Sequence, residues 1–198
     1  MSKWKDLEQR LARTEQQLRL FQRISRLMAS EATLQQVLNS IVRLIQEFTV
    51  CDSCLVYLLE GKELVLCASN NAPEHTLGRV RLSLHEGLTG WVARERRLLA
   101  ISQDAYSDPR FKTFSELEAD TFEAFLSAPV MARSKVVGVI NVQHRETHAY
   151  TGDEMELLTT VGEQVGCLLL LARMDKATIE RAVSLESVLA GTIAAARG

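Results

Sequence analysis

The sequence contains no apolar run that approaches the roughly 18 residues needed to cross a lipid bilayer. Its opening residues, MSKWKD, are too charged to lead into the apolar core of a signal peptide. The formal net charge of −2 gives no reason to expect nucleic acid or an anionic membrane as a partner. These absences favour a cytoplasmic protein that binds neither nucleic acid nor a membrane.

Cysteine is scarce. Three of the four cysteines sit inside apolar runs, where a free thiol behaves as a small apolar side chain, and this usage fits a reducing compartment. Cys51 and Cys54 have C-x-x-C spacing, but they fall between an expected helix and an expected strand, whereas a thioredoxin-type pair opens a helix after a strand. A zinc site would need a second ligand pair, for which His144 and His148 are weak candidates. The role of the two cysteines therefore stays open.

Residues 3–28 have the periodicity of a coiled-coil helix. The a and d positions of the heptad repeat are Trp4, Leu7, Leu11, Thr14, Leu18 and Phe21. The facing g and e pairs of a parallel dimer would be Lys3–Glu8, Arg10–Glu15 and Gln17–Gln22. No like charges meet in these pairs, which favours a parallel homodimer through this helix. The alternative is an amphipathic helix that folds onto its own domain.

The rest of the chain mixes helical and strand patterns. A capping box at residues 33–36 opens a helix that runs to residue 48, and a second one at residues 151–154 opens a long helix. Strands are expected at residues 54–59, 63–68, 79–83, 98–101, 125–132 and 136–143, with a short helix near Ser115. This order predicts an α+β domain on one antiparallel sheet. We expect a coiled-coil helix over residues 1–29, the folded domain over 30–174, and a helical extension over 175–198 that joins the dimer contact.

Residues 86–111 are the most irregular and polar part of the sequence. Gly87 suits the start of one or two helical turns, and the apolar run at 98–101 leads into a loop that holds two acids, a proline and an Arg-Phe pair. Loops at strand ends are where binding residues usually sit. The expected lining of a small-molecule pocket is Trp91, Ser102, Asp104, Asp108, Arg110, Phe111, Phe125 and Ser127.

Two of these residues have alternative roles. The planar guanidinium of Arg110 can hold the carboxylate or phosphate of a small anionic metabolite, or it can pair with Asp104 or Asp108 and fix the loop. Trp91 can form a wall of the pocket or belong to the core. The sequence has no Ser-His-Asp order, no metal-binding cluster and no Gly-rich phosphate loop, so we expect a protein that is not an enzyme.

Several stretches together resemble the GAF domain family. They are 86–93 (EGLTGWVA), 102–104 (SQD), 108–111 (DPRF), 125–130 (FLSAPV), 136–143 (VVGVINVQ) and 150–154 (YTGDE). The sequence is most similar in character to the N-terminal GAF domains of nitrogen-fixation transcription activators and of the nitrogen-regulatory phosphoenolpyruvate phosphotransferase. The resemblance implies a GAF/PAS-like six-stranded antiparallel sheet, with the terminal helices on one face and a ligand pocket on the other.

The resemblance does not identify a cofactor or ligand. The cyclic-nucleotide signature is broken at residues 143–144 and at Tyr150, since two rather than three residues separate Tyr150 from the Asp-Glu pair. Bilin-binding types need a pocket cysteine, and free methionine sulfoxide reductases need catalytic ones, but residues 68–166 contain none. His144 or His148 is a conceivable haem ligand from its position alone.

Two functions are compatible with the sequence. The first is a small-molecule-sensing regulatory GAF domain in signal transduction, which relays the state of its ligand through dimeric terminal helices. The alternative is a ligand-free dimerisation or scaffold module that acts on a partner protein. A pocket filled by aromatic side chains would favour the second function.

Overall fold

The computed structural model describes residues 2–112 and 122–171. Two predictions fall outside these residues, namely the short helix near Ser115 and the extension over 175–198. In the part of the chain that is described, no helix is both long enough and apolar enough to cross a membrane.

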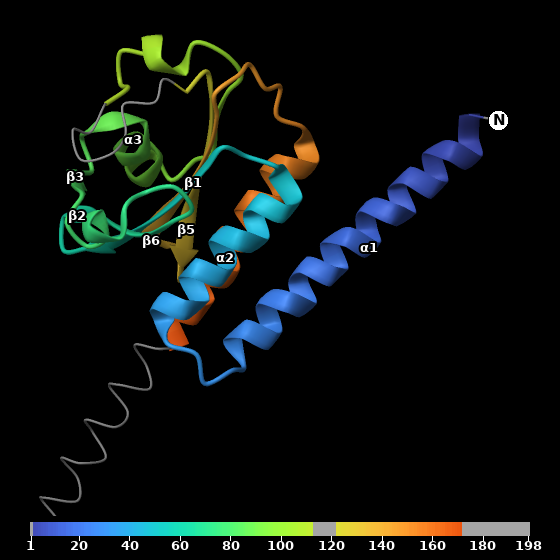
Figure 1. Cartoon of the computed structure of the whole chain (residues 1–198), viewed down its shortest axis with the longest axis horizontal. Helices are drawn as coiled ribbons and strands as arrows, with labels where there is room; N and C mark the ends of the chain where they lie inside the picture. The colour runs from blue at the N-terminus through green and yellow to red at the C-terminus, as the bar shows by residue number, and fades with distance from the viewer. Residues whose placement is uncertain (1, 113–121, 172–198) are drawn as a thin grey trace, which may run out of the picture.

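Six strands form one antiparallel sheet in the order β3-β2-β1-β6-β5-β4 (Figure 1). They are β1 (Ser53–Glu60), β2 (Glu63–Ser69), β3 (Arg81–Ser83), β4 (Leu99–Ile101), β5 (Ala124–Ala132) and β6 (Lys135–His144). The sheet confirms the predicted α+β class. The last strand in sequence, β6, lies between β1 and β5, as expected of a strand that is apolar on both faces.

The third strand is shorter than the predicted strand at 79–83. A single-turn helix, η1 (Glu74–Thr76), precedes it. The backbone amides of Arg79 and Val80 both donate to the carbonyl oxygen of Thr76, at 3.0 and 3.1 Å. Because these donors are committed to the turn, regular strand pairing begins only at Arg81.

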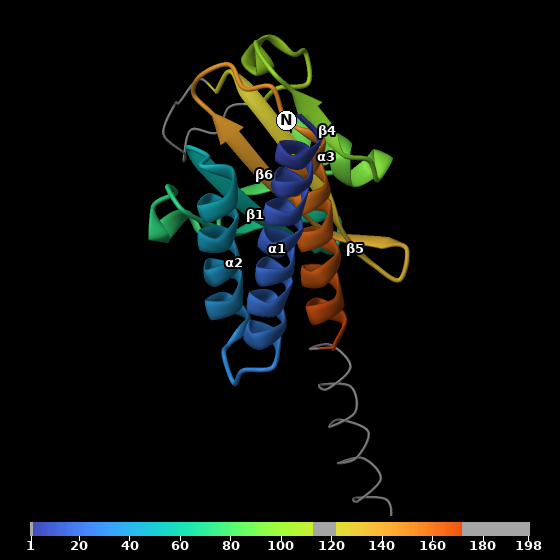
Figure 2. The same cartoon turned by 90° about the vertical axis from the view of Figure 1, so that its right-hand side faces the viewer.

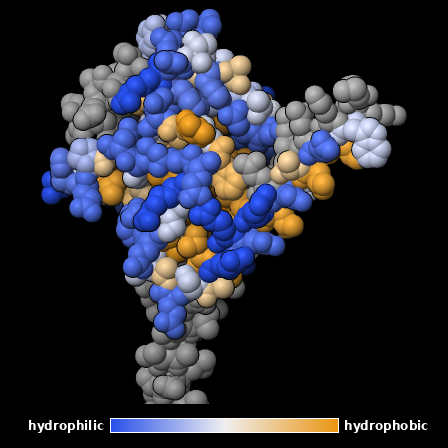
Figure 3. Space-filling view, turned by 45° about the vertical axis from the view of Figure 1, so that its right-hand side comes forward, coloured by the Kyte–Doolittle hydropathy of each residue, from blue (hydrophilic) through white to orange (hydrophobic). Residues whose placement is uncertain are grey.

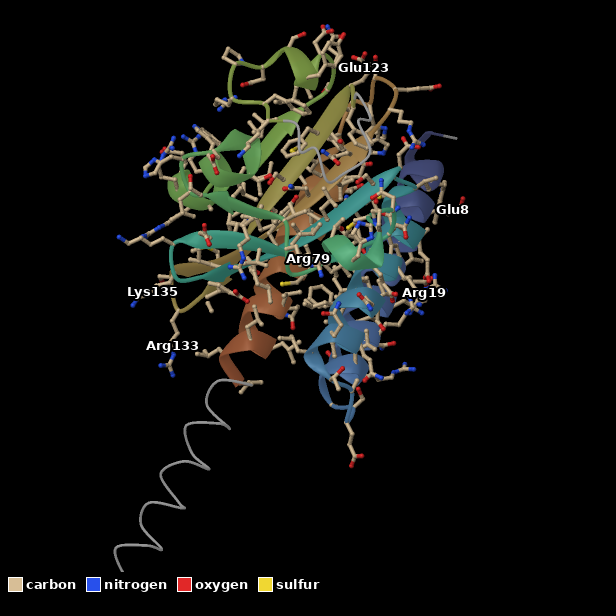
Figure 4. The ribbon with its side chains drawn as sticks, turned by 60° about the vertical axis from the view of Figure 1, so that its left-hand side comes forward. Glu8, Arg19, Arg79, Glu123, Arg133 and Lys135 are labelled. Carbon is tan, nitrogen blue, oxygen red and sulfur yellow. The ribbon has the colours of Figure 1, made fainter. Side chains whose placement is uncertain are left out.

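A two-residue turn joins β5 to β6. Its residues, Arg133 and Ser134, have φ angles of 46° and 60°, as type I′ hairpin turns require. Arg133 and Lys135 point into solvent from the tip of this hairpin (Figure 4).

Three helices cover one face of the sheet. They are α1 (Ser2–Met28), α2 (Leu34–Thr49) and a C-terminal helix whose described part is residues 152–171. Figures 1 and 2 show α2 and the C-terminal helix next to the sheet, with α1 outside them. The second half of α1 enters this core through Leu20 and Ile24, and Leu27 packs against it. The predicted placement of the terminal helices on one face is confirmed.

Both predicted capping boxes are present. At the start of α2, Gln36 N donates to Thr33 Oγ1 (3.3 Å) and Thr33 N donates to Gln36 Oε1 (2.9 Å). At the start of the C-terminal helix, Glu154 N donates to Thr151 Oγ1 (3.2 Å) and Thr151 N donates to Glu154 Oε2 (2.7 Å). Each pair satisfies backbone donors that a helix start would otherwise leave free.

The opposite face of the sheet carries α3 (Gly87–Glu95) and the short helix η2 (Ala105–Ser107). Gly87 allows the chain to enter α3 because its φ of +68° is in the left-handed region. Glu86 fixes this corner, since its Oε2 accepts from Ser83 N (2.8 Å) and its Oε1 pairs with Lys112 Nζ (3.0 Å). The apolar core on this face is Leu55, Tyr57, Leu64, Leu66, Val80, Leu82, Val92, Ala93 and Val139.

Candidate functional site

Polar side chains interrupt the apolar sheet face on the α3 side. Side chains alternate along a strand, so Asn141 and Gln143 of β6 share this face with Val139. In the neighbouring strand β5, Ser127 pairs with Asn141 and Phe125 pairs with Gln143. The central strands therefore present a polar group inside a surface that is otherwise apolar.

A buried chain of hydrogen bonds joins α3 to β5 and β6. Ser127 Oγ donates to Asn141 Oδ1 (2.7 Å), and Asn141 Nδ2 donates to Thr89 Oγ1 (2.8 Å). All three residues are buried. Because each of these contacts lies away from water, these hydrogen bonds fix the position of α3 over the sheet.

Gln143 is the exception in this polar group. Its side chain is 7% exposed, and within the described structure its Oε1 atom is fully buried and accepts no hydrogen bond. A buried acceptor without a donor costs about 1–3 kcal/mol. Natural structures keep few such groups, and a donor supplied by another molecule is one way in which such an acceptor is satisfied.

Trp91, Asp108 and Arg110 come together above this face. Arg110 donates from Nε to Asp108 Oδ1 (2.9 Å) and from Nη2 to Asp108 Oδ2 (2.7 Å). Its guanidinium carbon lies 4.8 Å from the centre of the Trp91 ring, which is cation–π geometry. The hydrogen bonds from Arg110 lower the pKa of Asp108. Of the two alternatives for Arg110, the structure shows the one in which it pairs with an acid of its own loop.

Phe111 and Phe125 also meet. Both belong to a small apolar cluster with Leu88 and Ala105, next to the polar group. The cluster closes the β4–β5 end of this face. Six of the eight predicted pocket residues therefore lie in three local groups, namely Trp91 with Asp108 and Arg110, Phe111 with Phe125, and Ser127 with Asn141.

The other two, Ser102 and Asp104, have exposed side chains in the loop after β4. The carbonyl oxygen of Ser102 accepts from His148 N (3.0 Å), and Asp104 N donates to Glu123 Oε2 (3.0 Å). Figure 4 shows Glu123 at the end of the molecule, away from the middle of the sheet. The structure does not bring Ser102 and Asp104 to the buried polar group.

Sequence reasoning missed three members of the site, namely Thr89, Asn141 and Gln143. A signal existed for two of them, because Asn141 and Gln143 are polar residues two apart in the apolar strand 136–143. Thr89 could not be found in this way, since its partner Asn141 is distant in the sequence.

The two cysteines and the late histidines lie on the helix side. Cys51 and Cys54 are buried free thiols, and burial raises the pKa of both, which keeps them protonated and unreactive. Among the described residues, no three His, Cys, Asp or Glu side chains are placed to hold a metal ion. His144 is hydrogen-bonded through Nδ1 to the hydroxyl of Tyr150 (3.1 Å).

A stacked histidine pair marks the start of the C-terminal helix. The rings of His144 and His148 lie 4.0 Å apart, and His148 Nε2 contacts Glu154 Oε1 at 2.8 Å. Burial, and then the nearby His148, lower the pKa of His144, although Asp52 and Glu154 act in the opposite direction. Protonation of His144 therefore opposes the folded state.

We predict that acid weakens the fold through His144. Because its pKa is lower in the folded than in the unfolded chain, the unfolded state binds more protons below about pH 6.5, and stability falls as the pH drops through that range. The difference in Tm between about pH 7.5 and about pH 5.5 should be smaller in His144→Gln than in the wild type. His75→Gln, at an exposed histidine, is the control and should keep the wild-type difference. An unchanged pH response in His144→Gln would contradict the prediction.

A groove of about 360 Å3 lies on the helix side, between α1 and α2. Three arginines and Glu47 are part of its lining, but Arg23 is already paired with Glu47. All of these charged side chains are exposed. The groove is separate from the buried polar group on the other face of the sheet.

Residues 31–169 match the GAF domain family. The chain belongs to this family. The phosphoenolpyruvate-dependent phosphotransferase system protein of Escherichia coli K12 is 29% identical over 144 residues, which cover 72% of this chain and 19% of that protein. The chain thus spans about a fifth of the length of the curated relatives it matches.

Two solved GAF domains of phosphoenolpyruvate-protein phosphotransferases have the same fold. The Acinetobacter domain is 26% identical, with a TM-score of 0.73, and the match covers 80% of this chain and 95% of that domain. The Coxiella burnetii domain is 23% identical, with a TM-score of 0.75, and the match covers 82% and 98%. The Acinetobacter match agrees with one of the two kinds of GAF domain that the sequence of this chain resembles.

Proposed function

We propose that this chain is a regulatory GAF domain that senses a small molecule bound between the sheet and α3. The observation that carries the proposal is the buried, unpaired Oε1 atom of Gln143. It lies on the same sheet face as the hydrogen-bonded side chains of Ser127, Asn141 and Thr89. A ligand that donates a hydrogen bond to Gln143 would remove the cost of leaving this acceptor unpaired. GAF family membership supports the regulatory role.

The charges around the site limit the ligand. Gln143 calls for an N–H or O–H donor, such as an amide, an ammonium or a hydroxyl group. An anionic group can reach the guanidinium of Arg110 only in competition with Asp108, which already holds it by two hydrogen bonds. A small polar metabolite fits both features, and a carboxylate on it would replace the Asp108 carboxylate as the partner of Arg110.

Ligand binding would act on the C-terminal helix through the strand β5. The side chain of Ser127 faces the site, and β5 continues through Pro129 and Met131, whose carbonyl oxygens contact this helix where its glycines lie. A ligand shifts the helix only if it binds two helix positions with different affinity. The similarity to phosphotransferase GAF domains supports phosphotransfer as the activity that is regulated. We propose no catalytic role for the chain itself.

A thermal-shift screen tests the proposal. The probes are free amino acids, 2-oxoglutarate, nucleotides and haem, which together supply the donor types named above. A compound that raises the Tm in a concentration-dependent way supports sensing, because a ligand that binds only the folded state stabilises it. If none of them raises the Tm, the alternative of a ligand-free scaffold that acts on a partner is favoured.

We predict that Gln143→Leu abolishes the thermal shift and stabilises the free protein by about 1–2 kcal/mol, because an apolar side chain removes the unpaired acceptor. Urea unfolding without ligand measures the gain, and the screen with the active compound measures the loss. Gln103→Leu, in an exposed loop, is the matched control and should change neither. A Gln143→Leu variant that still responds to the compound would place the ligand elsewhere.

A further inference from the structure

The helix α1 exposes an apolar stripe that is interrupted at Thr14. Its a and d residues Trp4, Leu7, Leu11, Leu18 and Phe21 are exposed, from 39% at Phe21 to 73% at Trp4. Figure 1 shows the N-terminal part of α1 extending away from the domain, and Figure 3 shows apolar side chains along this projecting arm. Single exposed apolar residues are ordinary, but a stripe of this length indicates a contact surface.

The stripe lies on the side of α1 that faces away from its own domain. The residues that anchor α1 to the core are Leu20 and Ile24. At about 100° per residue, Leu20 lies about 200° around the helix from Leu18, which belongs to the stripe. The domain therefore uses a different face of α1, and a partner can cover the stripe without displacing any internal contact. In the described structure the heptad residues are therefore not the ones by which α1 packs onto its own domain.

We infer that a second copy of this chain covers the stripe and that the two α1 helices form a parallel two-stranded coiled coil. The strict a/d spacing produces a narrow seam, which is the shape that a coiled coil buries. The charges beside the seam are self-complementary, because Arg10 at a g position would meet Glu15 at the e position of the second copy. The inference is independent of the proposed ligand.

Charge also selects the parallel arrangement. In an antiparallel pair, g positions face g positions and e positions face e positions. The g positions of α1 are basic or neutral, whereas the e positions are acidic or neutral. Every antiparallel register therefore pairs Arg10 with a basic or neutral residue, and Glu8 and Glu15 with acidic or neutral ones. Only the parallel arrangement brings opposite charges together.

The parallel arrangement would place both folded domains at the same end of the coiled coil. Because Leu20 and Ile24 fix α1 to the helical layer, the coil would hold the two copies of α2 and of the C-terminal helix close to its axis. Pairing of α1 would then bring together the parts of the two domains that lie opposite the proposed ligand sites.

Light scattering on the full chain tests the inference. The chain mass is 22.1 kDa, and we expect a dimer of twice this mass at micromolar concentration. Leu11→Glu together with Leu18→Glu should halve the mass and leave the domain folded, since both side chains are exposed in the single chain. Ala12→Glu adds a charge to the same helix outside the seam and should remain a dimer. A monomeric wild type, or a dimer that survives both seam charges, would overturn the inference.

Cross-linking tests the direction of the helices. In a parallel coiled coil, position 11 of one copy faces position 11 of the other, so Leu11→Cys should form a disulfide-linked dimer under mild oxidation. The experiment uses a Cys167→Ser background, because Cys167 is exposed. Absence of the cross-link in a protein that is dimeric by light scattering would overturn the parallel arrangement.

Discussion

Gly166→Ala is expected to destabilise the domain by about 2 kcal/mol or more. In an open helix the same change would be favourable by about 0.5–1 kcal/mol. Here a Cβ atom on Gly166 would lie 2.0 Å from the carbonyl oxygen of Met131, which is backbone and cannot move aside. One turn earlier, a Cβ atom on Gly162 would lie 2.9 Å from the carbonyl oxygen of Pro129. The two glycines let the C-terminal helix lie directly on β5, and overpacking there costs about 1–3 kcal/mol or more.

Thermal and urea unfolding measure this effect. For a chain of this size, a loss of about 2 kcal/mol lowers the Tm by about 4–8 °C. Gly152→Ala is the matched control, because no atom lies within 4 Å of the position its Cβ would take, and it should be neutral within about 0.5 kcal/mol. A Gly166→Ala variant as stable as the control would mean that the helix does not rest on β5 in solution.

Asn141→Leu is expected to cost about 2–5 kcal/mol. Leucine has a similar volume, so the loss comes from polarity rather than from a cavity. It would leave the buried hydroxyl groups of Ser127 and Thr89 without their partner, and each unpaired group costs about 1–3 kcal/mol. The change would also remove the buried hydrogen bond between α3 and β6, so binding in the proposed site should be lost together with stability.

A triple variant tests this explanation. Adding Ser127→Ala and Thr89→Val to Asn141→Leu makes the whole group apolar, and most of the lost stability should return. Single, double and triple variants measured by urea unfolding give the coupling energy among the three positions. Strictly additive losses would show that the three side chains do not act as one network.

Local sequence patterns predicted the secondary structure well. The two capping boxes depend on residues three apart, and the hairpin of β1 and β2 depends on an adjacent turn, so neighbouring residues are enough to specify them. The start of β3 was predicted too early because the decisive contact, from Val80 to the carbonyl oxygen of Thr76, competes with the strand pattern.

The site was predicted less completely, for a physical reason. Two acids, Asp104 and Asp108, precede Arg110 in its loop, and only the folded geometry shows that Asp108 holds it. The roles of Asn141 and Gly166 depend on elements far away in the sequence, namely α3 and β5. The strand pattern marks which residues share a face, but not what that face meets.

The central strand β6 forms a wall between two compartments, because its side chains alternate between them. Asn141 and Gln143 face the proposed site, whereas Ile140 and Val142 belong to the core beneath the helices. Loss or gain of one residue in β6 would exchange the two sets. Polar side chains would then enter the core beneath the helices, and apolar ones would face the proposed site. A substitution in this strand therefore affects one compartment, whereas a change of its length affects both.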